Sequence, residues 1–452
     1  MPHLKWTAII LTFLCIECNA QLYHSKTGKI IPTSKADTIL WTSGIFNHFY
    51  SDFGTLVVKE NRQKRDSRLI TIPVIRIKAF SNDSVLEPIF LLNGGPGESN
   101  INPELINVAL LENHDFVLVG YRGVDGSTSL DCPELSKRIF ADSLWNNKEH
   151  SINEVLSDCF VALSKSGIDI SGYTMHEVVY DIESVRKNLG YEKISFISFS
   201  YGTMLSQLYD QTHPNKVAKL VLIGARPIGD FHFYGEYLND QIELIYKYYF
   251  KDSTKTGFRN FTEFMLGVHS ILSFTNQNNS VIDCNKLLFF AFAQLYSVHN
   301  IEKTFHLLKS ISDTNTNNIA LEINKFYLNY PGELILPDLY LKKYEWGWDN
   351  NAIIKNGLGI GSKISDVINM YYNPSNYMDD KPTNFSYALS TTKTLIFSGE
   401  LDVAAPPELI SKSILPYYSN CEDVFYKKNG HLNLIIDKKE EVNYSIVKFF
   451  EN

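Results

Sequence analysis

The chain has 452 residues, of which 44% are hydrophobic and 20% are charged, and its net charge is -8 at pH 7. Because a single hydrophobic core stops growing at roughly 250–300 residues, we expect one core and a sizeable insertion. No stretch is repetitive or biased, which excludes a disordered or fibrous chain. The negative charges are spread along the chain, so nucleic acid is not expected as a partner.

The first twenty residues have the pattern of an export signal. Lys5 is followed by an apolar stretch, and small residues precede the predicted cleavage point after Ala20. We interpret residues 1–20 as a signal peptide and expect a secreted or periplasmic protein. Lipidation at Cys18 is disfavoured because Glu17 stands where a small side chain is required. No later run of about 18 uncharged apolar residues occurs, so no membrane anchor is expected.

Four cysteines follow that segment: Cys132, Cys159, Cys284 and Cys421. An even number in an exported protein predicts disulfides, and four buried free thiols are the alternative. A Cys132–Cys159 bond would stabilise the fold by roughly 3–4 kcal/mol in the chain-entropy model, and it leaves Cys284 to pair with Cys421. No CxxC or HExxH spacing is present, so neither a metal nor another cofactor is predicted.

The first predicted elements are strands. Residues 53–79 alternate and turn like antiparallel edge strands, and the basic run Arg62–Arg68 is interpreted as a solvated turn between two of them instead of a binding patch. Apolar runs at 88–92 and 116–119 predict short strands buried on both faces. Both runs end in glycine-rich loops, which is where a sheet of this kind carries function.

A regular alternation of helix and strand follows. Val178, Ile182, Val185 and Leu189 share one face of a predicted helix that stops at Gly190. Strands are predicted at 194–197 and 217–223, with a helix between them. This order predicts a parallel sheet with right-handed crossovers.

The rhythm is lost between about 228 and 385, where helix-like stretches rich in Tyr and Phe predict an inserted helical cap. A strand at 394–397 and a last amphipathic helix then resume the core. We therefore divide the chain into a signal peptide at 1–20, a first core part at 21–227, the cap at 228–385 and a second core part at 386–452.

Ser200 has the surroundings of an activated nucleophile. It lies in Ser198-Phe199-Ser200-Tyr201-Gly202, between a predicted strand and a predicted helix. Such a turn lifts the serine oxygen above the sheet and points a helix N-terminus at developing negative charge. The short motif occurs by chance in many chains, but this setting makes it specific.

A serine nucleophile needs a base and an acid, which follow such a turn in the order acid, then histidine. Asp402 comes just past the strand at 394–397 and is preferred to Glu400, which lies nearer the strand. His431 is the only one of the 12 histidines behind that acid. The predicted catalytic triad is Ser200, Asp402 and His431.

Two backbone amides are predicted to bind the oxyanion. Tyr201 supplies one because it follows the nucleophile. Gly95 supplies the other from Asn93-Gly94-Gly95-Pro96-Gly97, whose glycines let the main chain approach the substrate. A phosphate-binding loop is excluded because no Lys-Ser/Thr follows and Pro96 has no amide hydrogen.

These motifs, together with Tyr121-Arg122-Gly123, Thr203, Pro406-Pro407 and Gly430-His431, resemble those of the prolyl iminopeptidase and tripeptidyl aminopeptidase family of α/β-hydrolases. The resemblance covers nearly all of the chain after the signal and is weakest across the cap. It implies an α/β fold of the α/β-hydrolase type, with a mostly parallel central sheet, helices on both faces and an inserted helical cap. The chain departs from the family pattern at Asn93, Gly120 and Ser198, none of which belongs to the triad.

The resemblance also implies a short peptide as substrate, held by carboxylates that bind its free amino terminus. Glu236, Glu243 and Glu345 are the candidates, each with the alternative of a solvated charge on a helix surface. We predict an exported serine aminopeptidase that acts through an acyl-enzyme on Ser200. A carboxylester hydrolase with the same triad is the alternative, and the intact triad disfavours an inactive binding protein. The oligomeric state is not predicted.

Overall fold

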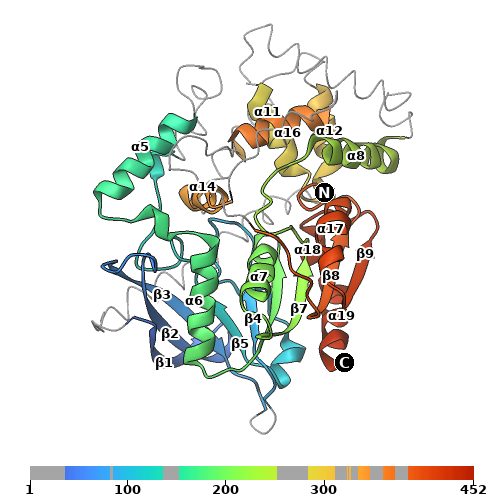
Figure 1. The fold of residues 1–452 in the computed structure, drawn as a ribbon. Helices are drawn as coiled ribbons and strands as arrows, with labels where there is room; N and C mark the ends of the chain where they lie inside the picture. The colour runs from blue at the N-terminus through green and yellow to red at the C-terminus, as the bar shows by residue number, and fades with distance from the viewer. Residues whose placement is uncertain are drawn as a thin grey trace, which may run out of the picture.

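The computed structural model describes residues 36–81, 85–135, 152–251, 284–310, 323, 325–326, 334–346, 360–371 and 385–452. Within them, nine strands form one sheet in the order β1-β2-β3-β5-β4-β6-β7-β8-β9 (Figure 1). The first three pairings in this order are antiparallel and the remaining ones are parallel. The strands are β1 (Thr38–Phe46), β2 (Phe49–Lys59), β3 (Leu69–Ile77), β4 (Ile89–Leu92), β5 (Phe116–Val119), β6 (Ile194–Phe199), β7 (Val217–Ile223), β8 (Lys393–Gly399) and β9 (Cys421–Tyr426).

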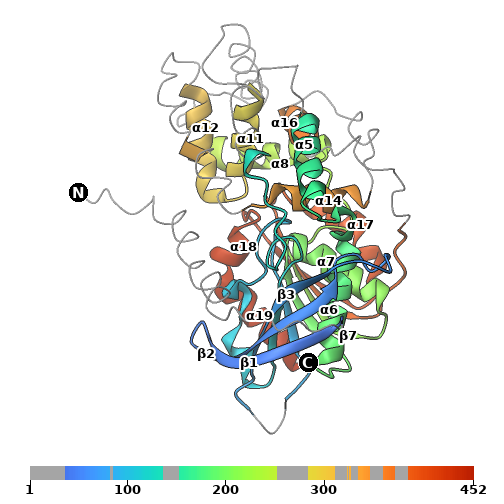
Figure 2. The same cartoon turned by 90° about the vertical axis from the view of Figure 1, so that its left-hand side faces the viewer.

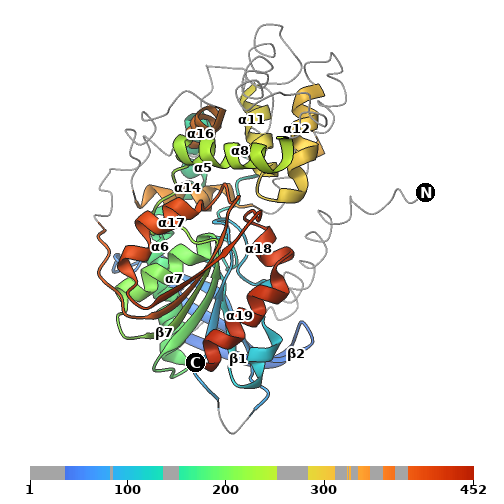
Figure 3. The same ribbon diagram turned by 90° about the vertical axis from the view of Figure 1, so that its right-hand side faces the viewer.

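Helices cover both faces of this sheet, as predicted. Helices α6 (Met175–Asn188), α7 (Tyr201–Thr212) and α17 (Pro407–Ser413) lie on one face, and α19 (Lys439–Glu451) lies on the other (Figure 3). Alternate residues of a strand point to opposite faces. Phe90 therefore packs with the core under α6 and α7, whereas its neighbour Ile89 packs with the core under α19.

Helix α6 shows how local sequence sets these elements. The Thr174 side chain accepts a hydrogen bond from Glu177 N and so caps the helix. Val178, Ile182 and Val185 are buried on one face, and Gly190 ends the segment with φ +74°. The prediction of this helix is confirmed.

The cap lies over the carboxyl end of the parallel strands (Figure 2). It is inserted between β7 and β8, which pair directly with each other. Helix α5 (Ile152–Lys165), which precedes Ser200, shares a hydrophobic core with the cap helices although it lies outside the predicted range 228–385. The cap helices are α8 (Gly235–Ile245), α11 (Cys284–Gln294), α12 (Ile301–Ser310), α14 (Leu336–Tyr344) and α16 (Ile360–Tyr371).

The cysteines correct the disulfide predictions. Cys132, Cys159 and Cys421 are free thiols. Cys421, the first residue of β9, is one of these free thiols, so the predicted pair with Cys284 is not formed. The Cys284 side chain lies outside the described residues.

Cys132 and Cys159 are also unbonded, but they pack in the same cluster. Burial, together with a contact to the Cys132 thiol, raises the pKa of Cys159. The structure therefore holds this pair in its reduced form. In the described part of the chain, no helix is long and apolar enough to cross a membrane.

Candidate active site

Ser200 occupies a strained turn between β6 and α7. Its φ and ψ are 51° and -119°, values that a non-glycine residue adopts only where surrounding structure imposes them. Ser200 N donates to Ile223 O at 3.0 Å, and Thr203 N donates to Ser200 O at 2.9 Å. A Cβ at Gly202 would lie 2.2 Å from Leu92 O, so only glycine allows α7 to pass so close to β4. These contacts hold Ser200 just beyond the carboxyl end of the central strand β6.

Ser198, where the family usually has glycine, is buried in this turn. Its Oγ donates to Val221 O at 2.8 Å and contacts Ser206 Oγ at 2.9 Å. The departure is therefore accommodated by a small side chain whose hydroxyl is satisfied inside the core.

Asp402 and His431 are brought together by the ends of β8 and β9. His431 Nδ1 lies 2.7 Å from Asp402 Oδ2, and both side chains are buried. Because a carboxylate only accepts hydrogen bonds, Nδ1 carries the hydrogen in this pair. Nε2 has no hydrogen-bond partner in the described residues and is left as the proton acceptor. This is the arrangement that a general base requires.

The rival acid Glu400 is engaged elsewhere. Its Oε1 accepts from Tyr248 OH at 2.9 Å, and its Oε2 accepts from Lys428 N at 2.9 Å. Glu400 therefore links the loops at the edge of the site, and Asp402 is the carboxylate that contacts the histidine.

Three residues that sequence reasoning missed surround the imidazole. A Cβ at Gly224 would lie 2.8 Å from His431 Cε1, so a side chain there would displace the ring. The Phe199 ring centroid is 4.9 Å from that of His431, which places the residue before Ser200 against the base. Tyr296, from the cap, meets the same ring edge-on at 5.5 Å. These residues are scattered along the chain, and no sequence spacing joins them.

The predicted oxyanion loop lies beside the serine. A Cβ at Gly94 would lie 3.4 Å from Ser200 Cβ. The next residue, Gly95, has a φ of +120°, which favours glycine. Gly97 also requires glycine, because its Cβ would lie 2.6 Å from Ile335 O in the segment leading into α14. Ile335 N donates to Gly97 O at 2.9 Å, so the loop is fixed from above by the cap.

Buried polar groups hold this loop from below. Asn100 donates to Leu91 O at 3.0 Å and to Val119 O at 2.8 Å, and its Oδ1 accepts from Asn93 N at 2.8 Å. Asp125 accepts from Asn100 N at 2.9 Å. Burial raises the pKa of Asp125 to about 6, although its hydrogen bonds oppose that rise.

The other two departures from the family pattern have structural reasons. Asn93, where histidine is usual, is tied to Asn100 and accepts from Tyr121 OH at 3.0 Å through its carbonyl. A Cβ at Gly120 would lie 2.6 Å from Asp125 Cβ, so an acidic side chain does not fit there in this structure.

The three predicted amine-binding carboxylates have other surroundings. Glu345 accepts from Met175 N at 2.6 Å and from His176 Nδ1, and so caps helix α6. Glu243 pairs with Lys247 at 3.0 Å, and Glu236 is exposed on α8. These placements favour a structural role for Glu345 and a solvated surface charge for the other two.

Glu98 was not predicted, yet it stands directly after the oxyanion loop. A Cβ at Gly95 would lie 3.6 Å from Glu98 Cβ, so the turn brings these two residues close together. The side chain is exposed and has no hydrogen bond or ion pair with another described residue. The pKa of Glu98 is nevertheless raised, first because the surrounding protein partly desolvates the carboxylate and second because the negative charge of Glu104 lies nearby. Its only sequence signal was its position after the glycines.

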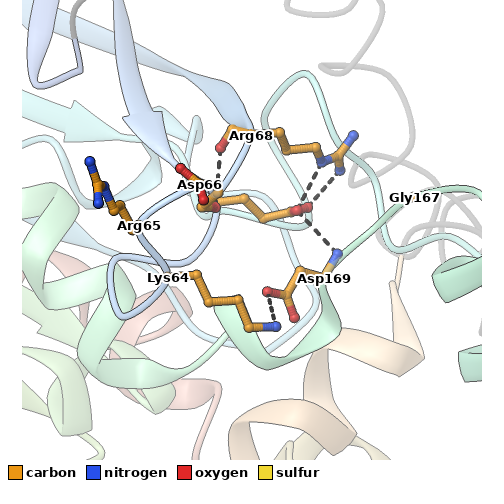
Figure 4. A pocket seen from close by; sticks show the side chains of 8 residues that line it. Lys64, Arg65, Asp66, Arg68, Gly167 and Asp169 are labelled. Atoms are coloured by element: carbon orange, nitrogen blue, oxygen red, sulfur yellow. Dashed lines mark hydrogen bonds and ion pairs between the residues drawn. The ribbon is translucent and has the colours of Figure 1, made fainter.

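The basic run forms a separate surface pocket, lined by Glu60, Lys64, Arg65, Asp66, Ser67, Arg68, Gly167 and Asp169. Lys64 Nζ lies 2.6 Å from Asp169, and Figure 4 shows these two side chains turned toward each other. Arg68 donates to Glu60 at 2.8 Å. Arg62 of the same run pairs with Glu177 and Asp181 on α6. The run is thus the predicted turn between β2 and β3, but Arg62 is bound to α6 and not solvated. Elsewhere in the described ranges, no group of three or more His, Cys, Asp or Glu could hold a metal ion.

Comparisons with known proteins give relatives for part of the chain. It is 28% identical over 193 residues to YuaR of Escherichia coli K12, a protein named as a hydrolase; this covers 40% of the chain and 35% of YuaR. It is 26% identical over 185 residues to the serine protease Hip1 of Mycobacterium tuberculosis H37Rv, and this match covers 38% of the chain and 35% of Hip1. It is 25% identical over 186 residues to the tripeptidyl aminopeptidase of Streptomyces lividans, and this match covers 37% of the chain and 34% of that enzyme.

The matched segment thus spans about a third of each of these relatives. A family model described as the alpha/beta hydrolase fold matches residues 87–437, a range that includes the elbow at Ser200, the cap and the Asp402–His431 pair. The chain therefore belongs to the α/β hydrolase fold family.

Proposed function

We propose that this chain is an exported serine aminopeptidase that releases one or a few residues from the amino terminus of short peptides. The observation that carries the proposal is the buried 2.7 Å contact between His431 Nδ1 and Asp402, which leaves Nε2 without a partner among the described residues, Ser200 included. The ring of Phe199, the residue before Ser200, contacts the same imidazole. Nε2 takes the hydroxyl proton of Ser200, and Oγ attacks the scissile carbonyl carbon. Tyr201 N and Gly95 N stabilise the resulting oxyanion.

Collapse of the tetrahedral intermediate breaks the peptide bond. The imidazolium of His431 protonates the amine of the remaining peptide, which leaves, and the amino-terminal fragment stays as an ester on Ser200. Water, deprotonated by the same Nε2, then hydrolyses this acyl-enzyme. The reaction needs no group beyond the side chains and backbone amides of this chain.

The peptidase assignment is supported by two relatives whose names give a serine protease and a tripeptidyl aminopeptidase. An exopeptidase must measure the distance from the chain end to the scissile bond, and the charged amino terminus marks that end. We assign this recognition to Glu98, which follows the oxyanion loop and whose Cβ lies close to Gly95. An ammonium group beside it would favour its ionised form and so oppose the partial desolvation and the nearby Glu104 charge that raise its pKa.

The test is a panel of aminoacyl and tripeptidyl amides, their N-acetylated forms and short acyl esters. Free peptides should be turned over, and acetylation should lower kcat/KM by at least about a hundredfold, because a bound peptide would cover the Glu98 carboxylate and leave its charge without a partner. Raising the pH through the α-amino pKa near roughly 8 should lower kcat/KM as well. Equal turnover of free and acetylated peptides would contradict recognition of the amine.

Glu98→Gln separates this role from a general loss of activity. It should lower kcat/KM for free peptides strongly and leave the N-acetylated forms nearly unchanged, with Glu236→Gln as a control exposed on α8. An equal loss on both substrate forms would remove Glu98 from this role. Rapid hydrolysis of esters with no turnover of peptides would support the carboxylester hydrolase alternative. Export is checked by sequencing the amino terminus of the secreted protein, which should begin at Gln21.

A further inference from the structure

The loop that carries His431 is joined to the cap by hydrogen bonds that the triad does not use. Leu432 N donates to Tyr296 O at 2.9 Å. In the opposite direction, Val298 N donates to Asn433 Oδ1 at 2.9 Å. The two residues flanking the proposed base on its C-terminal side are thus bonded to the short connection between cap helices α11 and α12.

Asn433 is the centre of this contact. It is fully buried at the start of the short helix α18 (Asn433–Ile436). Its Oδ1 also accepts from Gly430 N at 3.3 Å, and its Nδ2 donates to Asp437 Oδ2 at 2.5 Å. Asp437 in turn lies 2.8 Å from His299 Nε2 on the cap. One amide therefore bonds the residue before His431, the residue after α18 and the cap backbone.

The approach of the cap to this loop is close. A Cβ at Gly430 would lie 3.1 Å from Tyr296 O, so the glycine before the histidine gives room to a cap carbonyl. The Tyr296 ring meets the imidazole edge-on at 5.5 Å, and Phe199 contacts the same imidazole ring. The imidazole is thus enclosed by one ring from the core and one from the cap.

We propose that Asn433 is a positioning residue through which the cap holds His431 in its working orientation. The proposal rests on the proposed function, because it assumes that His431 is the base. The hydrogen bond to Asp402 fixes only Nδ1, and the ring can still tilt if its backbone moves. Asn433 fixes that backbone on both sides of the ring, at Gly430 and at the cap. The cap is then part of the catalytic machinery as well as a wall of the substrate site.

Two variants break this link from opposite sides. Asn433→Ala removes the amide from the core side. Val298→Pro removes the backbone N–H on the cap side and keeps an apolar side chain there. Position 298 opens a 3-10 turn, and the preceding Ser297 is extended, so both accommodate proline. Asn369→Ala is the matched control, since Asn369 is an equally buried amide that bonds Phe233 and Ser365 away from His431.

We measure kcat and KM on the best substrate of the panel, the rate at which a fluorophosphonate probe labels Ser200, and the melting temperature. Asn433→Ala and Val298→Pro should each lower kcat and the labelling rate about tenfold to a hundredfold, with KM changed less than about threefold, because a base misplaced by about 1 Å loses that much. Asn369→Ala should lower the melting temperature comparably without this loss of kcat.

An exchange of donor and acceptor provides the rescue. Asn433→Asp alone places two carboxylates together and should lower kcat, whereas Asn433→Asp combined with Asp437→Asn restores one donor opposite one acceptor and should recover most of the labelling rate. Unchanged kcat in Asn433→Ala, or an equal loss in Asn369→Ala, would overturn the positioning role. A loss in Asn433→Ala with none in Val298→Pro would overturn the part assigned to the cap. Failure of the probe to label Ser200 in the unmodified protein would instead refute the proposed function, and with it this inference.

Discussion

At the scale of single residues, Asp402 divides its two carboxylate oxygens between two tasks. Oδ1 accepts from Ala404 N at 2.8 Å and from Ala405 N at 2.7 Å, which fixes the carboxylate within its own loop. Oδ2 is then presented to His431. The acid is thus oriented before substrate arrives, and a change of one oxygen to an amide disturbs the histidine more than the loop.

Replacing members of the proposed triad should abolish turnover while the fold remains. Ser200→Ala or His431→Ala should lower kcat by a factor on the order of 10⁴ to 10⁶, and Asp402→Asn should cost somewhat less. Circular dichroism and melting temperature check the fold. Ser206→Ala is the control, because Ser206 is a buried serine on α7 that contacts Ser198. Retention of more than about a tenth of the activity in Ser200→Ala would exclude this serine as the nucleophile.

The turn at Ser200 and the contact between Asp402 and His431 could be predicted, because the order of these residues along the chain follows from the order of the strands that carry them. The contacts of Gly224 and Asn433 could not, since each lies against a neighbour that is distant in sequence. Gly224, for example, matters because His431 lies against it, and nothing in the residues around position 224 indicates that contact. The prediction for Glu345 was misled by composition, because an acidic residue in the cap has the same signal whether it binds substrate or caps a helix.

At the scale of secondary structure, the elements with a clear pattern of buried apolar residues were predicted, whereas the first edge strand, which lacks one, was missed. Helix α6 and strands β4 to β8 bury their apolar residues in regular patterns. Strand β1 buries no side chain fully, so its sequence lacks the alternation that reveals an edge strand. The position of α14 could not be predicted either, because it is set by contacts with residues distant in sequence. Ile335, before α14, bonds Gly97, and Glu345, after it, bonds the start of α6.

Glu345 is expected to stabilise the junction between α14 and α6. It ends α14 and places a carboxylate on the free amides at the start of α6, where the helix dipole favours negative charge. Glu345→Ala should lower the free energy of unfolding by about 1–3 kcal/mol, measured by urea denaturation. Glu236→Ala on the exposed face of α8 should change it by less than about 0.5 kcal/mol. Equal stability of the two variants would show that the cap of α6 contributes little.

At the scale of the whole molecule, the structure joins two stretches of chain in one cap layer. Helix α5 precedes the nucleophile, yet it shares its core with helices inserted after β7. The sequence analysis assigned α5 to the core part and the other helices to the cap. A periodic pattern indicates which face of a helix is buried, but it does not indicate which other element covers that face. The adjacent Cys132 and Cys159 lie where this layer meets the loop that follows β5.

The proposed export would bring these two thiols, which are reduced in this structure, into an oxidising compartment, where we expect them to form a disulfide. They are already packed together, and the bond would stabilise the fold by roughly 3–4 kcal/mol. Alkylation of the denatured, unreduced protein should modify Cys421 and leave Cys132 and Cys159 unlabelled, as read by peptide mass. Reduction before alkylation is the control and should expose both. Labelling of both without a reductant would show that the pair remains reduced.

The insertion between β7 and β8 also has a consequence for biosynthesis. These strands are neighbours in the sheet, but β7 ends at Ile223 and β8 begins at Lys393. At roughly 5–20 residues per second, a ribosome needs on the order of ten seconds or more to make the stretch between them. For that interval the newly made β7 has an open edge with the apolar run Leu220–Ile223, and Lys219 is the only charge within the strand. A nascent chain of this architecture therefore depends on delayed pairing, and a translational pause within the cap would prolong the time in which β7 can associate with other unfinished chains.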